Sequence, residues 1–432
     1  MRLPQFGRLV RPLERAVSSY PCPPLELPKP SLDWGQLSDP ANLGSIQSNI
    51  DIKKSRADIR RVQELFKEIY LNTCIHDTKS EVGREATEAN LLAAALQVPN
   101  MCSQHSVDLG TDNEVLYEKP FTNPEFKVRK FEDVARILSG ARLTNLGVTS
   151  GERAYHLMGP LAELELALVQ WATDALVERG WRFLGVPDIL HPGVVEACGM
   201  TVEGERTQVY RLAQGGAALA GTAEMSIGGY LAGRQVEERP LKLAAVSRCY
   251  RAETSRIKDE GGLYRVHAFT KVEMFVVTEG KPEASEAALA EVLALQQELF
   301  SSLGLAHRVL AMCPEELGDP ATTKYDVEAW LPGRGFWGEI SSCSDCTDYQ
   351  ARRLALTQAD GSFCHTVNGT ACAVPRMILA ICEQFQTASG AVAVPEVLRP
   401  YLRGRELLEP LAKKQRPNFQ WIPGATWLEG RE

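Results

Sequence analysis

Two stretches near the start of the chain carry apolar residues at helical intervals. In residues 51–70, apolar side chains fall along one face of a helix, at Ile52, Ile59, Val62, Phe66 and Ile69. A second run, residues 86–98, ends at Pro99, which cannot continue a helix. Because a polar break at residues 77–83 separates the two runs, they predict a short helical hairpin. Its charges are mixed and nearly balanced, so the simplest interpretation is a solvated surface feature.

The rest of the chain shows other patterns. Residues 20–45 are rich in proline and predict a linker, whereas residues 101–125 are polar and predict a loop. Further on, a long helical run at 161–179 precedes β-rich runs at 243–250, 266–277 and 325–330. Neighbouring strand pairs with helices between the groups are typical of an antiparallel sheet covered by helices. We therefore predict an α+β fold.

Composition narrows the class of protein. The chain has 432 residues, of which 44% are hydrophobic and 24% charged, an ordinary globular balance. This excludes a disordered chain, a collagen-like repeat and a coiled-coil rod. No window offers the roughly 18 apolar residues that a membrane helix requires. The net charge of −8 argues weakly against a nucleic-acid coat, but a local basic surface is still compatible with it.

The first 25 residues differ from the remainder of the chain. They contain four arginines and only one acidic residue, Glu14, and they lack a long apolar segment. An arginine-rich, acid-poor and weakly amphipathic start is typical of a mitochondrial presequence. The lack of a long apolar segment argues against a secretory signal. A basic terminus without a targeting role is the alternative interpretation.

Eleven cysteines are scattered without the spacing of a disulfide framework, which favours reduced thiols. Cys343 and Cys346 form one C-x-x-C pair. A zinc site would need a second pair or suitably spaced histidines, and neither is near. Two interpretations of the pair remain, a redox-active couple and two buried thiols beside a loop.

The densest chemistry lies between residues 221 and 376. Residues 248–254 read RCYRAET, and residues 262–273 read GLYRVHAFTKVE. On regular strands, alternate residues share a face: Arg251 with Glu253, and Arg265, His267, Phe269, Lys271 and Glu273. Arginines bind phosphate in a bidentate manner, a ring can stack on a purine, and a carboxylate can hold an ammonium group. A lone R-x-E is most often a surface ion pair, but that does not explain the whole string.

These residues resemble motif 2 of the class II aminoacyl-tRNA synthetases, specifically the seryl-tRNA synthetases. Residues 221–224 (GTAE) are similar to that family's serine-site loop. Residues 326–330, 338–344 and 347–353 resemble the signature before motif 3, and residues 365–376 resemble motif 3 itself. Residues 180–200 are similar to motif 1. The resemblance covers roughly residues 120–400. The chain lacks the P-loop pattern and a G-x-G-x-x-G that opens a helix after a strand, so any nucleotide would be bound on another scaffold.

The resemblance implies a division of the chain and an activity. Residues 1–25 would be a presequence, 26–120 a linker with a short helical tRNA-binding arm, 121–405 the class II catalytic domain, and 406–432 a tail. The activity would be activation of serine by ATP with Mg²⁺, and transfer of the seryl group to the 3′ end of tRNA(Ser). The protein would be a homodimer through motif 1, without a membrane association. It would act in the mitochondrial matrix, with the cytoplasm as the alternative.

The resemblance also implies roles for single residues at the nucleotide. Arg251 would bridge the serine carboxylate and the α-phosphate of ATP. Glu253 would contact the adenine side, with Val266 nearby, and Phe269 would stack on the adenine. Arg376 would stack on the other face of the base or grip the γ-phosphate. Arg251, Glu253 and Arg376 would be the catalytic residues.

The remaining roles concern the metal and serine. Glu339 and Ser342 would hold the Mg²⁺ that bridges phosphates. The residues implied for the serine site are Thr222, Glu224, Glu273, Asn368 and Thr370. Thr222 and Glu273 would bind the ammonium group, and Glu273 with Asn368 and Thr370 would recognise the hydroxyl.

The helical hairpin departs from the family, because it is much shorter than the usual coiled-coil arm. It does end in Val98–Pro99–Asn100, as that arm usually does. The short arm leaves a second interpretation, in which the chain is a catalytically inactive, synthetase-like paralogue that acts as a binding partner.

Overall fold

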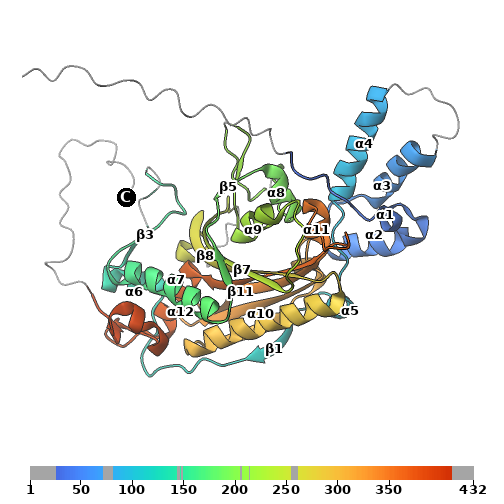
Figure 1. Ribbon diagram of the computed structural model, residues 1–432. Coiled ribbons are helices and arrows are strands. Elements are labelled where there is room, and N and C mark those ends of the chain that lie inside the picture. The colour runs from blue at the N-terminus through green and yellow to red at the C-terminus, as the bar shows by residue number, and fades with distance from the viewer. Residues whose placement is uncertain are drawn as a thin grey trace, which may run out of the picture.

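An eight-stranded sheet forms the centre of the molecule (Figure 1). The computed structural model describes residues 26–71, 81–143, 146, 149–204, 207–213, 215–253 and 261–410. The strands in spatial order are β1 (Glu114–Glu118), β9 (His307–Ala311), β10 (Thr323–Leu331), β11 (Phe336–Thr347), β12 (His365–Ala373), β8 (Ala268–Thr278), β7 (Leu241–Tyr250) and β4 (Arg182–Leu184). Neighbours are antiparallel except β4 and β7, which are parallel.

Helices cover both faces of this sheet. On one face lie α6 (Phe131–Leu138), α7 (Pro160–Glu178), α10 (Pro282–Ser302) and α12 (Val374–Gln384), and on the other lie α8 (Pro192–Ala197), α9 (Ala223–Leu231) and α11 (Tyr349–Leu354) (Figure 1). Strand β8 shows why both layers are needed. Met274 and its alternate neighbours belong to the main core, whereas Phe275 and Val277 pack in a separate cluster with α9. The predicted α+β fold with an antiparallel sheet is confirmed.

Smaller elements complete the chain. Three two-stranded sheets pair β2 (Ala141–Arg142) with β3 (His156–Leu157), β5 (Ile189–Leu190) with β6 (Ala218–Leu219), and β13 (Val392–Ala393) with β14 (Leu407–Leu408). Single 3₁₀ turns span Pro40–Asn42, Gly262–Tyr264, Pro314–Glu316, Glu396–Leu398 and Pro400–Leu402. No helix in the described part of the chain is both long and apolar enough to cross a membrane.

The N-terminal part is a separate helical layer with its own core. It contains α1 (Trp34–Ser38), α2 (Leu43–Ile52), α3 (Ile59–Phe66), a π-helical turn (Lys67–Leu71) and α4 (Glu81–Leu96). Side chains from all four α-helices meet in one apolar cluster, including Ile46, Ile59, Val62 and Leu91. Helices α3 and α4 project from the body that contains the eight-stranded sheet, as a hairpin (Figure 1).

The predicted elements agree with the structure for strands and differ in the N-terminal region. β7, β8, β10 and α7 lie within two residues of their predicted bounds. The single helix predicted at 51–70 is wrong, because the chain breaks between α2 and α3, where Lys54 has a φ of 52°. The linker at 20–45 contains α1 and part of α2, and the loop at 101–125 contains α5 (Gln104–Asp108) and β1. α4 begins at Glu81, inside the predicted polar break, whose remainder lies outside the described residues, as do residues 1–25 and 411–432.

The helical layer is fixed to residues 318–321 of the sheet-containing body by a buried lysine at the end of α2. Lys53 Nζ donates to the carbonyl oxygens of Gly318 at 3.0 Å, Asp319 at 3.4 Å and Ala321 at 2.7 Å. Burial lowers the pKa of Lys53 to about 8. The charged end is therefore solvated by backbone dipoles instead of water.

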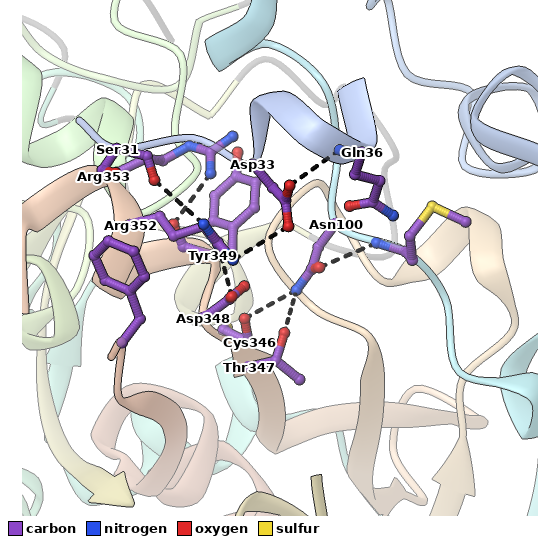
Figure 2. Close-up of polar contacts among 12 residues, drawn as sticks. Ser31, Asp33, Gln36, Asn100, Cys346, Thr347, Asp348, Tyr349, Arg352 and Arg353 are labelled. Carbon is purple, nitrogen blue, oxygen red and sulfur yellow. Dashed lines mark hydrogen bonds and ion pairs between the residues drawn. The ribbon is translucent and has the colours of Figure 1, made fainter. Parts of the chain in front are cut away.

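Asn100, just after the hairpin, makes a second connection (Figure 2). Its side-chain amide donates to Pro320 O, Cys346 O and Thr347 Oγ1, each at 2.9 Å. The amide of Asn49 in α2 donates to Asn100 O at 3.0 Å. Residues distant in the sequence are thus joined at the turn that precedes α11.

Two arginines of α11 complete the attachment (Figure 2). Arg353 Nη2 donates to Leu96 O at 3.0 Å and to Val98 O at 3.3 Å, which are free carbonyls at the end of α4. Arg352 pairs with Asp33 at 3.4 Å, before α1. The base of the hairpin and α11 are therefore packed as one unit.

Candidate active site

A cavity opens on the α9 side of the sheet, near the ends of β7, β8, β11 and β12. The predicted residues that line it are Arg251, Glu253, Val266, Phe269, Glu339, Ser342, Thr370 and Arg376. Residues that are more than a hundred positions apart in the chain therefore share one cavity, because β8 and β12 are neighbours in the sheet.

The first group of cavity residues follows the end of β7. Arg251 is half-buried, its Nε donates to Gly221 O at 3.2 Å, and its guanidinium carbon lies 5.6 Å from the centre of the Phe269 ring. Glu253 forms an ion pair with Arg265 at 3.4 Å, and only 6% of the Glu253 side chain is exposed. Two cations, an aromatic ring and a carboxylate thus line one wall of the cavity.

The opposite wall is formed by Arg376 and Glu339. Arg376 Nη1 donates to Glu339 O at 2.9 Å and pairs with Glu339 Oε2 at 3.1 Å. The guanidinium of Arg376 lies 4.6 Å from the centre of the Tyr264 ring. Burial raises the pKa of Glu339, but Arg376, Lys324 and Arg251 outweigh burial and lower that pKa to about 2. Glu339 is consequently ionised throughout the physiological range.

A β-bulge brings Glu339 and Ser342 to the same side of β11. Residues three apart on a regular strand point to opposite faces. Opposite β10, however, Val327 pairs with Ser341 and Glu328 with Glu339, so Ile340 is an extra residue in β11. Ile340 is buried in the main core, and the whole segment from Glu339 to Ser342 borders the cavity.

These two side chains supply oxygen ligands of the kind that Mg²⁺ uses. Mg²⁺ is usually held by one or two protein groups together with substrate phosphates, not by a complete protein cage. Consistent with this, the described residues contain no group of three or more His, Cys, Asp or Glu side chains that could hold a metal alone. Glu339 and Ser342 therefore fit a metal that arrives with a nucleotide.

A buried polar cluster adjoins the cavity. Lys271 pairs with Glu273 at 2.5 Å, and both side chains are almost fully buried. Thr370 Oγ1 lies 3.5 Å from Glu273 Oε2, which connects the cluster to the cavity wall. Thr222 caps α9 by accepting from Glu224 N at 3.4 Å.

Glu224 is the second carboxylate of this cluster. Its Oε1 accepts from Gln350 Nε2 at 2.5 Å and from Asn368 Nδ2 at 2.8 Å. Burial, reinforced by the nearby Glu273 charge, raises the pKa of Glu224 to about 7, although Lys271, Gln350 and Arg251 act in the opposite direction. The predicted residues Thr222, Glu224, Glu273 and Asn368 thus lie together behind the cavity, and Thr370 lies between the two groups.

The strand alternation predicted for residues 265–273 is wrong at its start, and three residues of the cavity had no predicted role. β8 begins at Ala268, after the turn at Gly262–Tyr264, so strand alternation does not apply to residues 265–267. His267 instead places its Nδ1 2.9 Å from Arg251 O. Arg265 and Lys271 line the cavity, although the sequence predicts only that they share one face of a strand. Tyr264 also lines the cavity, and no pattern in the sequence indicates it.

The two thiols of the C-x-x-C pair have different surroundings. Cys343 packs in the main core, whereas Cys346 Sγ accepts from Asn368 Nδ2 at 3.6 Å. Burial raises the pKa of both thiols well above the ordinary value. Both are therefore protonated at neutral pH, which disfavours the redox interpretation and favours that of buried thiols.

Comparisons with known proteins agree with this arrangement. Residues 218–385 match the family model for the tRNA synthetase class II core domain (G, H, P, S and T). The chain is 42% identical over 337 residues to the mitochondrial serine–tRNA ligase of Bos taurus, covering 75% of this chain and 64% of that protein. It is 38% identical to the serine–tRNA ligase of Rubrobacter xylanophilus, covering 75% of this chain and 78% of that protein.

Solved structures show the same similarity. The cytoplasmic serine–tRNA ligase of Naegleria fowleri in complex with AMP superposes with a TM-score of 0.75 and 27% identity, covering 88% of this chain and 99% of that one. The seryl-tRNA synthetase of Pyrococcus horikoshii complexed with ATP gives a TM-score of 0.71 and 28% identity, covering 85% and 92%.

Proposed function

This chain belongs to the family of seryl-tRNA synthetases, and we propose that it is an active serine–tRNA ligase. It would activate serine with ATP to form seryl-adenylate and pyrophosphate, and then transfer the seryl group to the 3′ end of tRNA(Ser). The matched stretch covers only 64% of the bovine relative, so the activity is argued from the site. The observation that carries the proposal is a single cavity containing Arg251, Phe269, Glu339 and Arg376 beside buried carboxylates.

The chemistry of activation fits these residues. A carboxylate attacks a phosphorus atom, and both partners are negatively charged. Arg251, which lines the cavity, would bridge the serine carboxylate and the α-phosphate, and Arg376 would hold the rest of the nucleotide. Mg²⁺ at Glu339 and Ser342 would neutralise charge on the phosphates. Since the substrate carboxylate is itself the nucleophile, the chain needs no general base, and positioning supplies much of the rate.

The remaining predicted residues would select the two substrates. Phe269 would stack on adenine, with Glu253 and Val266 at its edge. In the polar cluster, Glu224, Glu273 and Thr222 would hold the serine ammonium group, and Asn368 and Thr370 would help to recognise the hydroxyl. A site that hydrogen-bonds a substrate hydroxyl can reject the analogue that lacks it by roughly 10⁴-fold or more, so alanine should be a poor substrate.

ATP–pyrophosphate exchange tests the proposed function directly. Protein lacking residues 1–25 would be assayed with serine, threonine and alanine. We expect exchange with serine alone. If folded protein supports no exchange with any of the three, the proposal fails and the inactive paralogue becomes the better interpretation. All the predicted catalytic side chains are present in the sequence, which argues against that alternative.

The hairpin of α3 and α4 would contact tRNA(Ser). Arg60 and Arg84 are exposed on it and could reach phosphates of the tRNA backbone. Replacing both with glutamate should raise the KM for tRNA about tenfold or more, because attraction to phosphate becomes repulsion. Serine-dependent exchange should stay unchanged, since neither arginine lines the cavity.

The matched control for this double variant replaces Glu64 and Glu85, also exposed, with glutamine. Aminoacylation kinetics at two salt concentrations would distinguish electrostatic contact from misfolding. If aminoacylation and exchange decline together, the hairpin is structural and not a tRNA-binding element.

We also propose a location and an assembly. Two of the similar proteins are mitochondrial, and the first 25 residues have the composition of a presequence, so the matrix is the expected compartment. Fusion of those residues to a fluorescent protein tests this, and a diffuse cytoplasmic signal would favour the alternative. A homodimer through residues 180–200 and the neighbouring α7 is expected because α7 exposes Leu166 and Val177. A monomeric mass in analytical ultracentrifugation would exclude it.

A further inference from the structure

The short helix α11 contacts the serine site on one side and the hairpin base on the other. Arg352 and Arg353 are directed toward the N-terminal layer (Figure 2), whereas Gln350 contacts the buried polar cluster. Gln350 is only 1% exposed. It belongs to residues 347–353, which resemble the family signature before motif 3, and the resemblance implies no role for it.

We propose that Gln350 is a positioning residue for serine recognition, because it fixes the orientation of the Glu224 carboxylate. This inference rests on the proposed function and extends it to a residue that would not itself touch the substrate. The geometry carries it: Gln350 Nε2 donates to Glu224 Oε1 at 2.5 Å, and Gln350 Oε1 accepts from Thr366 Oγ1 at 2.8 Å.

The Glu224 carboxylate determines which way the Gln350 amide faces. When ionised it can only accept, so the amide nitrogen faces Glu224, and the amide oxygen accepts from the hydroxyl of the buried Thr366 in β12. Asn368, two residues along the same strand, donates to the same oxygen of Glu224 at 2.8 Å. With both donors on Oε1, the other carboxylate oxygen, Oε2, is left to receive the substrate.

The opposite side of α11 holds this arrangement in place. Arg353 is bonded to the end of α4, and Asn100 to the turn at Cys346 and Thr347, so α11 cannot shift without breaking buried contacts. A site group must be held to a fraction of an ångström by its supporting residues to be effective. Gln350 therefore transmits the rigidity of α11 to the carboxylate that would hold the serine ammonium.

Gln350→Met tests the proposal, because methionine has a similar shape but neither the donor nor the acceptor. We expect the KM for serine in ATP–pyrophosphate exchange to rise about 10- to 100-fold, the usual effect of losing a hydrogen bond to a charged group. The kcat at saturating serine and the KM for ATP should change less than about threefold, since the nucleotide wall is untouched.

Gln350→Glu provides a pH readout that a purely structural role would not produce. When protonated, this side chain still donates to Glu224, so the KM for serine should be near that of the unaltered protein at pH 6.5. As the pH rises to 9 the second carboxyl ionises beside Glu224, and the ratio of variant to unaltered KM should increase. This variant also keeps the test informative if Gln350→Met folds poorly.

Arg352→Met is the matched control on the same helix. It removes the contacts with Asp33, Ser31 and Asp348 but none with Glu224, so its serine KM should not change. An unchanged serine KM in Gln350→Met, or an equal loss in kcat and in the KM for ATP, overturns the positioning role. Absence of serine exchange in the unaltered protein would instead refute the proposed function, and this inference with it.

Discussion

Replacing Arg251 with alanine should reduce serine-dependent ATP–pyrophosphate exchange by ~10³-fold or more, because the substrate carboxylate and the α-phosphate would lose the cation between them. Arg251 is the one arginine that approaches both the serine-site loop, through Gly221 O, and the ring of Phe269. The other cations that line the cavity are already paired with carboxylates: Arg376 with Glu339, Arg265 with Glu253 and Lys271 with Glu273.

The control for Arg251→Ala is Arg248→Ala. Arg248 lies at the end of β7 as well, but it is exposed and donates to Thr270 on the other face of the sheet. Its replacement should leave exchange unaltered. Thermal unfolding of both variants would establish that the fold is retained, which we expect because neither side chain is part of the apolar core. Near-normal exchange in Arg251→Ala would remove Arg251 from the catalytic residues.

Replacing Glu339 with glutamine should lower exchange at ordinary Mg²⁺ by ~10²- to 10³-fold and shift the Mg²⁺ titration to higher concentration. Glutamine retains an oxygen that can accept from Arg376, so the ion-pair geometry is largely preserved while the charge is lost. The pKa of Glu339 is about 2, so the residue supplies a full negative charge at any pH above about 4. Between pH 6 and 8 the Mg²⁺ requirement of the unaltered protein should therefore not depend on this carboxyl.

Glu328→Gln is the matched control for the metal prediction. Glu328 is the register partner of Glu339 on β10, but it pairs with Arg308 at 2.6 Å and does not line the cavity. The Mg²⁺ titration curve of the Glu328→Gln variant should coincide with that of the unaltered protein. If Glu339→Gln also leaves the Mg²⁺ curve in place, Glu339 serves Arg376 and not the metal.

Of the four strands that carry the site, β7 and β8 were predictable, because both have strong β-rich runs with a polar face at one end. β11 and β12 were not among the predicted strands. The contents of the cavity were predictable only through the family resemblance. The bulge at Ile340, which aligns Glu339 with Ser342, depends on the pairing with β10 and has no local signal. The role of Gln350 depends likewise on a contact with a helix 126 positions earlier in the sequence.

The N-terminal error has a similar origin. The apolar pattern of residues 51–70 is helical almost throughout, so a single helix was the natural prediction. The helix ends at Ile52, directly before Lys53, whose side chain bonds three carbonyls of residues 318–321. Propensity cannot anticipate a constraint whose partners lie more than 260 residues away.

The attachment of the hairpin base to α11 and to residues 318–321 has a consequence for how the hairpin could vary. Its direction is set at the base by Lys53, Asn100 and Arg353, independently of how far it extends. Insertion or deletion of residues in its two helices would therefore lengthen or shorten the hairpin along its own axis, by about 1.5 Å per residue. Because the base of the hairpin is anchored, its length could change during evolution without changing the position of the cavity residues.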